Sequence, residues 1–179
     1  MSESVLQTLV ERFPEQILTS HAHVGDETIV TRAEHLLEIA RFLREDDAMA
    51  FDFMSDVTCV DYLKREPRFE VVYHLYSLKH RHRIRVKIAL PEGQESLPSL
   101  CGLWAAANWG EREVWDMYGI RFEGHPNLRR VLMYEEFEGH PLRKDYPIQQ
   151  SQPRMDLRRR ERDAVEEYHT LYRDGADTE

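Results

Sequence analysis

The chain has 179 residues, a mass of 21.3 kDa and a formal net charge of −9, from 24 Lys and Arg against 33 Asp and Glu. This length corresponds to one ordinary domain, or to one domain with an arm. Residues 1–78 carry 7 basic and 15 acidic side chains, whereas residues 79–179 carry 17 and 18, so almost all of the excess negative charge lies in the first part. Because an acidic surface repels phosphates, we do not expect a nucleic-acid partner.

Composition also argues against membrane-spanning, secreted and cluster-binding proteins. The longest stretch without a polar side chain is residues 100–107, far short of the about 20 residues of a membrane helix. The first four residues do not resemble a secretory leader. Cys59 and Cys101 are too few for a disulfide framework or a four-thiolate cluster, so we expect a reducing cytoplasmic compartment and two buried, unreactive thiols.

Capping signals and apolar periodicity predict two helices and three strands in the first 62 residues. The expected elements are a helix from Ser4 to Pro14, strands over 17–24 and 28–31, a helix from Thr31 to about Arg44, and an irregular strand over 51–62.

The clearest hairpin joins residues 69–78 to residues 83–90 across the turn 79–82. Arg83, Arg85 and Lys87 fall on one face of its second strand, and Lys79 and Arg81 lie in the turn. We interpret this basic face as a solvated outer surface that protects a sheet edge, with a docking surface as the alternative and nucleic-acid binding as a third, least favoured interpretation.

Two helices are predicted after a polar loop between Pro91 and Pro98. Ser99 is the expected N-cap of the first, which carries Leu100, Leu103, Trp104 and Ala107. The second runs from about Gly110 to Tyr118 and ends at Gly119, a residue suited to the left-handed conformation.

The character of the chain changes after Gly119. Prolines and glycines interrupt regular structure for some 35 residues, yet this stretch is rich in Leu, Val, Ile, Phe and Tyr that must be buried on its own domain or on a partner. We therefore divide the chain into an α+β domain (1–119), an extended partner-wrapping arm (120–155), and a charged C-terminal helix and tail (156–179).

The sequence contains no dinucleotide-binding, P-loop or zinc-protease motif. Each of the pairs His21/His23 and His80/His82 could supply two metal ligands from a strand, but neither has a third ligand nearby, so we expect surface histidines and no metal site.

Charged residues are dense between positions 111 and 116. Helical spacing places Glu113 and Arg112 beside Asp116, which predicts a buried or interfacial charge network, with acid–base catalysis as the less favoured alternative. His125 and His140 each stand in a Gly-His-Pro triplet followed by basic residues, which favours rigid, extended segments whose guanidinium groups bind carboxylates.

These residues resemble a known family. A first block (residues 111–132, with Glu-Arg-Glu-x-x-Asp-Met-Tyr-Gly-Ile and Gly-His-Pro-x-Leu-Arg-Arg) and a second block (residues 139–147, Gly-His-Pro-Leu-Arg-Lys-Asp-Tyr-Pro) are similar to the C subunit of NADH-quinone oxidoreductase, respiratory complex I, the 30-kilodalton subunit family. The hairpin over 71–87 and Asp61-Tyr62 also fit, so the resemblance spans about Ile29 to Pro147.

The resemblance implies an α+β fold with a mixed or antiparallel sheet and packed helices, followed by an extended C-terminal arm. It implies no flavin, iron–sulfur cluster or other cofactor bound by this chain, and no catalytic residue of its own. The expected role is a non-catalytic scaffold in the peripheral arm of proton-translocating NADH:quinone oxidoreductase, on the cytoplasmic side of the bacterial inner membrane. There it would dock to the D subunit as its main partner, to the B subunit and to other peripheral-arm subunits, and support electron transfer from NADH to quinone.

The family's motif also implies which residues form the partner interface. They are Glu111, Arg112, Glu113, Asp116, Gly119, His125, Pro126, Arg129, Arg130, His140, Pro141, Arg143, Lys144 and Asp145. The alternative functions are an equivalent subunit of a related membrane-bound hydrogenase or ferredoxin-linked complex, and a free-standing enzyme that uses Glu113, Asp116 or His125.

Overall fold

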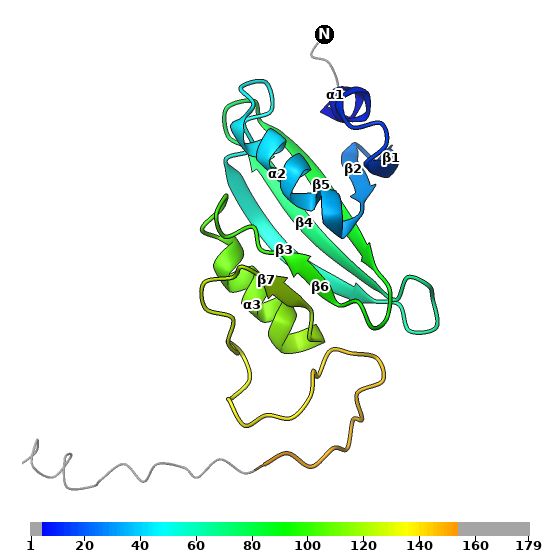
Figure 1. Cartoon of the computed structure of the whole chain (residues 1–179), viewed down its shortest axis with the longest axis vertical. Helices are drawn as coiled ribbons and strands as arrows, with labels where there is room; N and C mark the ends of the chain where they lie inside the picture. The colour runs from blue at the N-terminus through cyan, green and yellow to red at the C-terminus, as the bar shows by residue number, and fades with distance from the viewer. Residues whose placement is uncertain (1–4, 154–179) are drawn as a thin grey trace, which may run out of the picture.

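The computed structural model describes residues 5–153, which form an α+β domain followed by an irregular arm (Figure 1). The charged helix expected over residues 156–172 lies outside the described residues. The helices are α1 (Val5–Arg12), the 3-10 turn η1 (Ala33–His35), α2 (Leu36–Glu45) and α3 (Ala107–Tyr118). The strands are β1 (Ile17–His23), β2 (Asp26–Thr31), β3 (Phe53–Asp61), β4 (Phe69–Ser77), β5 (His82–Leu90), β6 (Ser96–Pro98) and β7 (Arg121–Glu123).

The main sheet has five strands in the order β1-β2-β5-β4-β3. The neighbours β1/β2, β5/β4 and β4/β3 are antiparallel, whereas β2 and β5 are parallel, so the sheet is mixed. A register shift between Met54 and Asp56 makes β3 irregular, which confirms the prediction for that segment. The predicted fold class, an α+β domain with a mixed sheet and packed helices, is confirmed.

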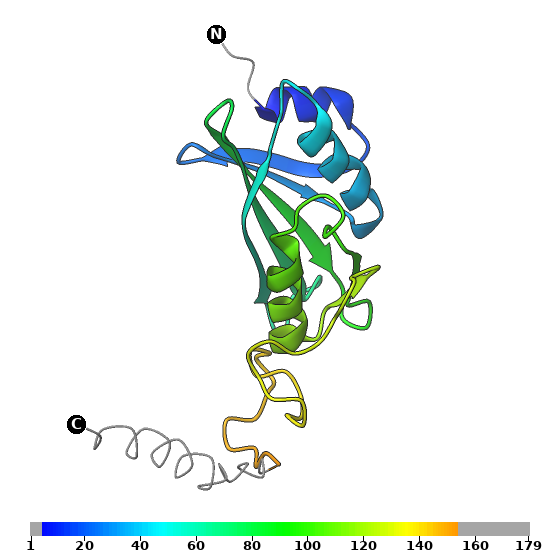
Figure 2. The ribbon, with the colours of Figure 1, turned by 90° about the vertical axis from the view of Figure 1, so that its left-hand side faces the viewer.

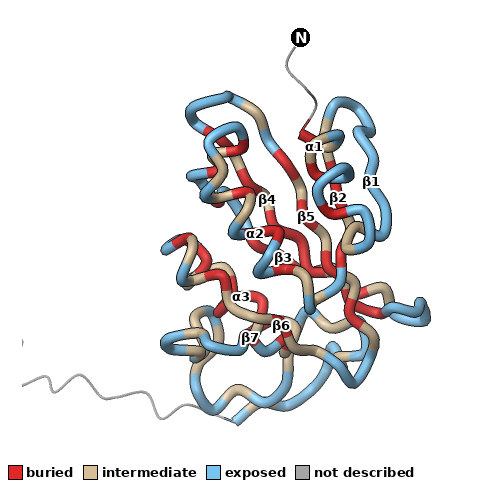
Figure 3. Tube along the Cα trace, turned by 45° about the horizontal axis from the view of Figure 1, so that its top comes forward, coloured by how far each residue is buried: buried red, intermediate tan, exposed pale blue. Residues whose placement is uncertain are grey.

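The hydrophobic core lies between the sheet and the helices. In Figure 2, α1 and α2 lie on the same side of the sheet, and Figure 3 shows buried residues following β4 and β5. α2 buries Leu36, Ile39, Ala40 and Leu43 along one stripe, as its apolar spacing predicts. α3 packs so closely on β3 that a Cβ atom added at Gly110 would lie 2.9 Å from the Cβ atom of Val57.

The predicted helix after Ser99 is wrong. Residues 101–106 form turns, and a single helix, α3, begins at Ala107. The Ser99 hydroxyl donates to Glu111 of α3, and the Trp104 indole N–H donates to the carbonyl of Phe51 at 2.9 Å. These tertiary bonds, together with burial of the Trp104 ring, fix an irregular path that local propensity does not show.

Three further details differ from the predictions. The polar loop before Ser99 contains β6, which pairs in parallel with β7, and strands of three residues have no detectable periodicity. Thr31 does not cap a helix, because it ends β2 and its hydroxyl donates to the carbonyl of Gln16 at 2.7 Å. Regular structure continues past Gly119 to Glu123, and residues 124–153 contain no helix or strand.

Within residues 5–153, no helix has the length and apolar character that a membrane crossing requires.

Candidate functional site

The arm meets α3 around the carboxylate of Asp116, which is fully buried. Its Oδ1 accepts a hydrogen bond from Arg130 Nη1 at 2.5 Å. Its Oδ2 accepts from the backbone N–H groups of Val131, Leu132 and Met133 at 3.0, 2.9 and 2.9 Å. Three successive N–H groups around one oxygen form an anion-binding nest. Burial alone would raise the pKa of Asp116, but these donors outweigh it and hold the pKa below its usual value.

The arm also covers the C-terminal end of α3, whose last carbonyl groups have no partner within the helix. Three of these carbonyls accept hydrogen bonds from the arm: Asp116 O from His140 Nδ1 at 2.9 Å, Met117 O from Leu142 N at 3.1 Å, and Tyr118 O from Arg143 Nε at 2.5 Å. Since an accepting carbonyl requires a donor, His140 carries its proton on Nδ1. Burial lowers the pKa of His140, which is consistent with a neutral ring.

Gly119 makes this close approach possible in two ways. It ends α3 with a φ of 78°, in the left-handed region that glycine adopts without strain. It also lacks a Cβ atom, which would lie 2.6 Å from His140 Cδ2 and 2.9 Å from Arg143 Nη2. The glycine therefore ends the helix and leaves room for the two side chains of the second block.

The second block has another anchor, on the end of β3. Arg68 forms a bidentate pair with the buried carboxylate of Asp61, at 3.0 Å for both Nε–Oδ1 and Nη2–Oδ2, and also contacts Asp145 at 2.8 Å and Glu92. Asp61 Oδ2 accepts the backbone N–H of Lys144 at 2.8 Å. The Arg68 hydrogen bonds are the largest cause that lowers the pKa of Asp61 and that of Asp145. We call Asp61 and Arg68 with these arm contacts the Asp61 anchor.

The arm buries part of its apolar surface on itself. The Phe137 ring lies edge-on to Tyr134 and stacks on Tyr146, with ring centroids 5.6 and 6.1 Å apart. The guanidinium of Arg130 lies 5.6 Å from the Phe137 ring and 5.8 Å from the Trp115 ring. Arg130 therefore links the Asp116 carboxylate to this aromatic cluster.

The N-terminal half of α3 holds a second buried carboxylate, Glu111. Its Oε1 accepts the backbone N–H of Leu100 at 2.7 Å, and its Oε2 accepts the Ser99 hydroxyl at 2.6 Å and the Cys101 thiol at 3.5 Å. These hydrogen-bond donors are neutral, and burial raises the pKa of Glu111 above its usual value. Glu111 therefore fixes the turn after β6 against α3.

The charge network predicted within α3 is wrong in its pairing. Arg112 does not bind Asp116 but donates to the carbonyls of Arg129 and Arg130 at 3.1 and 3.2 Å, and it packs on the Trp109 ring at 4.7 Å. Glu113 is exposed to solvent. Helical spacing permits an Arg112–Asp116 pair. In the folded chain, however, the arm places Arg130 beside Asp116, and its backbone carbonyls accept hydrogen bonds from Arg112 instead.

Most of the predicted interface residues meet at the two ends of α3, and some do not. The structure brings Arg112, Asp116, Gly119, Arg130, His140, Arg143, Lys144 and Asp145 together at the Asp116 and Asp61 contacts, and Glu111 and His125 together beside the turn after β6. Glu113, Pro126 and Arg129 are exposed, and Pro141 is partly buried.

Sequence reasoning missed Arg68, Ser99 and Glu92 as functional residues and gave Asp61 no role. The available signal was Asp61 itself, because alternation along β3 places an acid on the buried face, where it needs a cationic partner. Arg68 lies seven positions further along the chain, beyond a loop, so spacing alone does not reveal it.

The two His-x-His pairs lie apart from this region. His80 and His82 bind the carbonyls of Asp47 and Met49 at 2.8 and 3.0 Å and so fix the loop after α2, whereas His21 and His23 lie on the exposed strand β1. The prediction that the basic face protects a sheet edge is wrong, because β5 is the central strand of the main sheet. Its charge is partly compensated by Lys79–Asp47, Arg85–Asp26 and Lys87–Glu70 pairs at 3.2, 3.5 and 2.8 Å.

The buried carboxylates of this region are arranged as anchors. The carboxylates of Asp61, Glu111 and Asp116 each accept two or more hydrogen bonds from the protein. Two hollows of about 330 and 610 Å³ lie elsewhere, one beside Phe53 and Tyr76 on the sheet and one between Phe13 and Glu38. The molecule is thus an α+β domain whose irregular arm is fixed by buried carboxylates.

The comparisons with known proteins identify the family. The sequence pattern of the respiratory-chain NADH dehydrogenase 30 kDa subunit matches residues 29–152. The chain belongs to this family, as its resemblance to the C subunit of NADH-quinone oxidoreductase implies.

Curated relatives agree with this assignment. The C subunit of NADH-quinone oxidoreductase from Roseiflexus sp. (strain RS-1) is 51% identical over 145 residues, which cover 81% of this chain and 83% of the relative. The C 2 subunit of the same enzyme from Rhizobium etli (strain CIAT 652) is 50% identical over 140 residues, which cover 78% and 74%.

Solved structures share the fold. A trypsin-resistant fragment (1–134) of Nqo5 is 35% identical with a TM-score of 0.61, covering 69% of this chain and 98% of the fragment. A chain of the membrane-bound sulfane sulfur reductase, an archaeal respiratory membrane complex, is 24% identical with a TM-score of 0.70, covering 81% of this chain and 85% of that one, and it supports the fold alone.

Proposed function

We propose that this chain is a non-catalytic scaffold subunit in the peripheral arm of proton-translocating NADH:quinone oxidoreductase, and that its arm docks to the D and B subunits. The observation that carries the proposal is that the arm has two kinds of residue, polar ones that bind α3 and apolar ones that stay exposed. Its polar residues hold the arm against α3, whereas Leu132, Leu142 and Ile148 remain 57%, 47% and 100% exposed. Trp109 of α3 is 64% exposed as well. Exposed apolar side chains on a fixed segment favour a protein partner.

Such a role assigns the interface residues two tasks. Asp116, Arg130, His140 and Asp145 set the shape of the arm through bonds inside the chain. Exposed residues of the same blocks, such as Arg129, reach the partner. The chain then supports electron transfer from NADH to quinone by holding the D and B subunits in place, with flavin and iron–sulfur clusters bound elsewhere in the complex. We infer a peripheral position on the cytoplasmic side of the bacterial inner membrane.

The experiment compares two variants of a tagged chain during purification of the whole complex. Leu132→Gln combined with Leu142→Gln removes apolar contact from the arm, and Leu78→Gln, at a 62% exposed residue after β4, is the control. We expect the double variant to bind the other subunits about 30-fold more weakly, from about 2 kcal/mol of lost apolar burial. Equal recovery of the complex with both variants would contradict a docking arm.

Limited proteolysis supplies an independent test. We expect residues 120–150 to be cleaved by trypsin in the isolated chain, first after the exposed Arg129, and to be protected in the assembled complex. The similar Nqo5 fragment is described as trypsin-resistant, which supports a resistant domain. Equal protection of the arm in the isolated and assembled forms would count against partner wrapping.

The alternative is an equivalent subunit of a related membrane-bound hydrogenase or ferredoxin-linked complex. The subunits that co-purify decide between the two. Partners that bind NADH and flavin support NADH-quinone oxidoreductase, whereas nickel–iron hydrogenase subunits support the alternative.

A further inference from the structure

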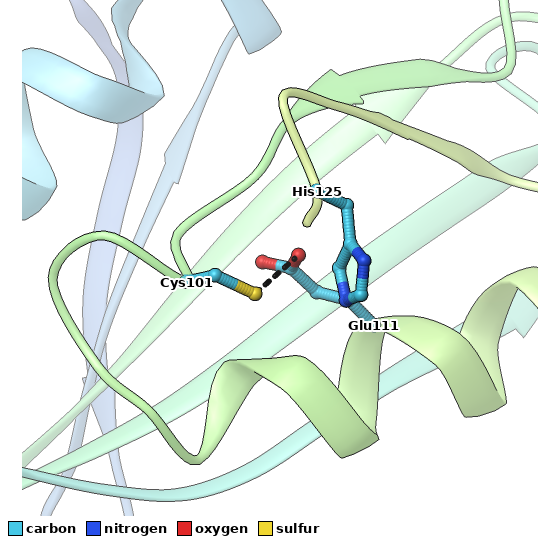
Figure 4. Close-up of side chains that lie close together, drawn as sticks. All are labelled: Cys101, Glu111 and His125. Carbon is cyan, nitrogen blue, oxygen red and sulfur yellow. Dashed lines mark hydrogen bonds between the residues drawn. The ribbon is translucent and has the colours of Figure 1, made fainter. Parts of the chain in front are cut away.

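Cys101, Glu111 and His125 converge beside the N-terminal half of α3 (Figure 4). They come from three segments, the turn after β6, the helix α3 and the loop after β7. One possible ligand atom from each, a thiol sulfur, a carboxylate oxygen and a ring nitrogen, lies within 4.8 Å of the others. One ion could therefore contact all three after a small local movement.

The ligand types and their spacing match a zinc-type ion. Thiolate, imidazole and carboxylate are the groups that bind Zn²⁺ in proteins. Tetrahedral geometry with a Zn–S bond of about 2.3 Å and a Zn–O bond of about 2.1 Å places sulfur and oxygen about 3.6 Å apart. The distance from Cys101 Sγ to Glu111 Oε2 is 3.5 Å, so these two ligands already have suitable spacing. The imidazole nitrogen lies within 4.8 Å of both, so it must move closer by at most about 1.3 Å.

The surroundings of Glu111 supply a second, independent observation. Its carboxylate is fully buried, yet the donors of its hydrogen bonds from Ser99, Leu100 and Cys101 are neutral. A buried carboxylate gains most from a cation at close range. Cys101 and His125 are only partly buried, so an ion can reach the carboxylate from solvent.

We propose that Cys101, Glu111 and His125 form a three-ligand site for a divalent cation of the zinc type, with water in the fourth position. Three protein ligands and a water are the usual set for an open zinc site. Binding releases the Cys101 thiol proton to solvent, and the carboxylate and one neutral ring nitrogen complete the site. The proposal replaces the expectation, drawn from sequence, that this chain binds no metal.

Coordination requires His125 to exchange its present bonds. In the structure, Nε2 donates to the carbonyl of Asn108 at 3.1 Å, and Nδ1 accepts the backbone N–H of Asn127 at 3.0 Å. The nitrogen that binds the ion gives up its bond, while the other carries the ring proton. Because the thiol must also lose a proton, affinity falls as the pH is lowered.

The test is a titration of the reduced full-length chain with Co²⁺, a coloured substitute for Zn²⁺. We expect a near-ultraviolet thiolate-to-cobalt band and visible bands of tetrahedral intensity, both removed by added Zn²⁺. Cys101→Ser should abolish the near-ultraviolet band, and His125→Gln should weaken binding at least about 10-fold. Cys59→Ser, at the buried thiol, and His80→Gln, at a histidine that binds Asp47, are matched controls that should leave the titration unchanged.

Circular dichroism and thermal unfolding establish that each variant is folded. If Cys101→Ser does not fold, X-ray absorption of the zinc-loaded wild-type chain decides, because the site requires one sulfur ligand with nitrogen and oxygen. The proposal fails if the wild-type chain gives no thiolate band, if the band survives in folded Cys101→Ser, or if the absorption data show only nitrogen and oxygen ligands.

Discussion

Glu111 and Asp116 lie on the same helix, and both carboxylates are fully buried, yet their surroundings shift their pKa values in opposite directions. Asp116 faces a guanidinium and three backbone N–H groups of the arm. Glu111 faces neutral donors from the turn after β6. The C-terminal half of α3 is therefore built around a stabilised anion, and the N-terminal half around a carboxylate that favours its proton. Of these two carboxylates, only Asp116 therefore holds the arm through its charge.

The largest effect is expected from breaking the arm contact. Asp116→Ala removes the acceptor of three backbone N–H groups and the carboxylate partner of Arg130, whose guanidinium keeps only backbone carbonyls as acceptors. We expect a loss of about 3–5 kcal/mol in the free energy of unfolding, measured with urea, because one partner of a buried pair is removed. Trypsin cleavage after Arg129 should become faster as well.

Glu113→Ala is the matched control, because this exposed acid lies on the same helix. It should change the unfolding free energy by less than about 0.5 kcal/mol. Equal losses in Glu113→Ala and Asp116→Ala would show that the arm does not depend on the buried charge.

An intermediate effect is expected at the end of α3. Gly119→Ala strains a residue with positive φ and also places a methyl group against His140. Gly124 has nearly the same φ as Gly119, 77° against 78°, but a Cβ atom added there would have no atom within 4 Å. Gly124→Ala therefore tests the strain alone. We expect a loss of about 1–2 kcal/mol for Gly124→Ala from strain alone, and about 1–3 kcal/mol more for Gly119→Ala from crowding.

Thermal or urea unfolding of the two glycine variants measures the difference. Gly102→Ala, where φ is ordinary and the added Cβ meets no neighbour, should lie close to wild type. If Gly119→Ala and Gly124→Ala are equally unstable, then the close approach of the second block to α3 contributes nothing.

The amino-acid sequence predicts the elements whose formation depends on residues close together in the chain. The strands of the main sheet and the helix α2 follow local alternation and periodicity, so their positions were correct within a few residues. The turns over 101–106 were not predictable, because Trp104 and Ser99 find their partners in Phe51 and Glu111.

The same limit applies to the candidate site. The blocks that resemble the family contain Asp116, Arg130 and His140, but not the pairing between them, since Arg112 was an equally reasonable partner for Asp116. The Asp61 anchor joins Lys144 to a residue 83 positions earlier, a contact that no spacing rule suggests. Buried charges are thus visible in the sequence as residues, while their partners appear only in the fold.

The smallest effect, and the most direct test of the two halves of α3, is the pH dependence of stability. The lowered pKa of Asp116 means that its contribution is present above its usual value of 3.8 and is lost as the pH falls through the lowered pKa. The raised pKa of Glu111 means that its contribution is present below its usual value of 4.5 and is lost as the pH rises through the raised pKa. Urea unfolding from about pH 3 to pH 8 should therefore show wild type losing stability relative to Asp116→Asn on acidification, and relative to Glu111→Gln on alkalinisation. If the two differences follow the same direction with pH, the carboxylates do not differ in the way their contacts indicate.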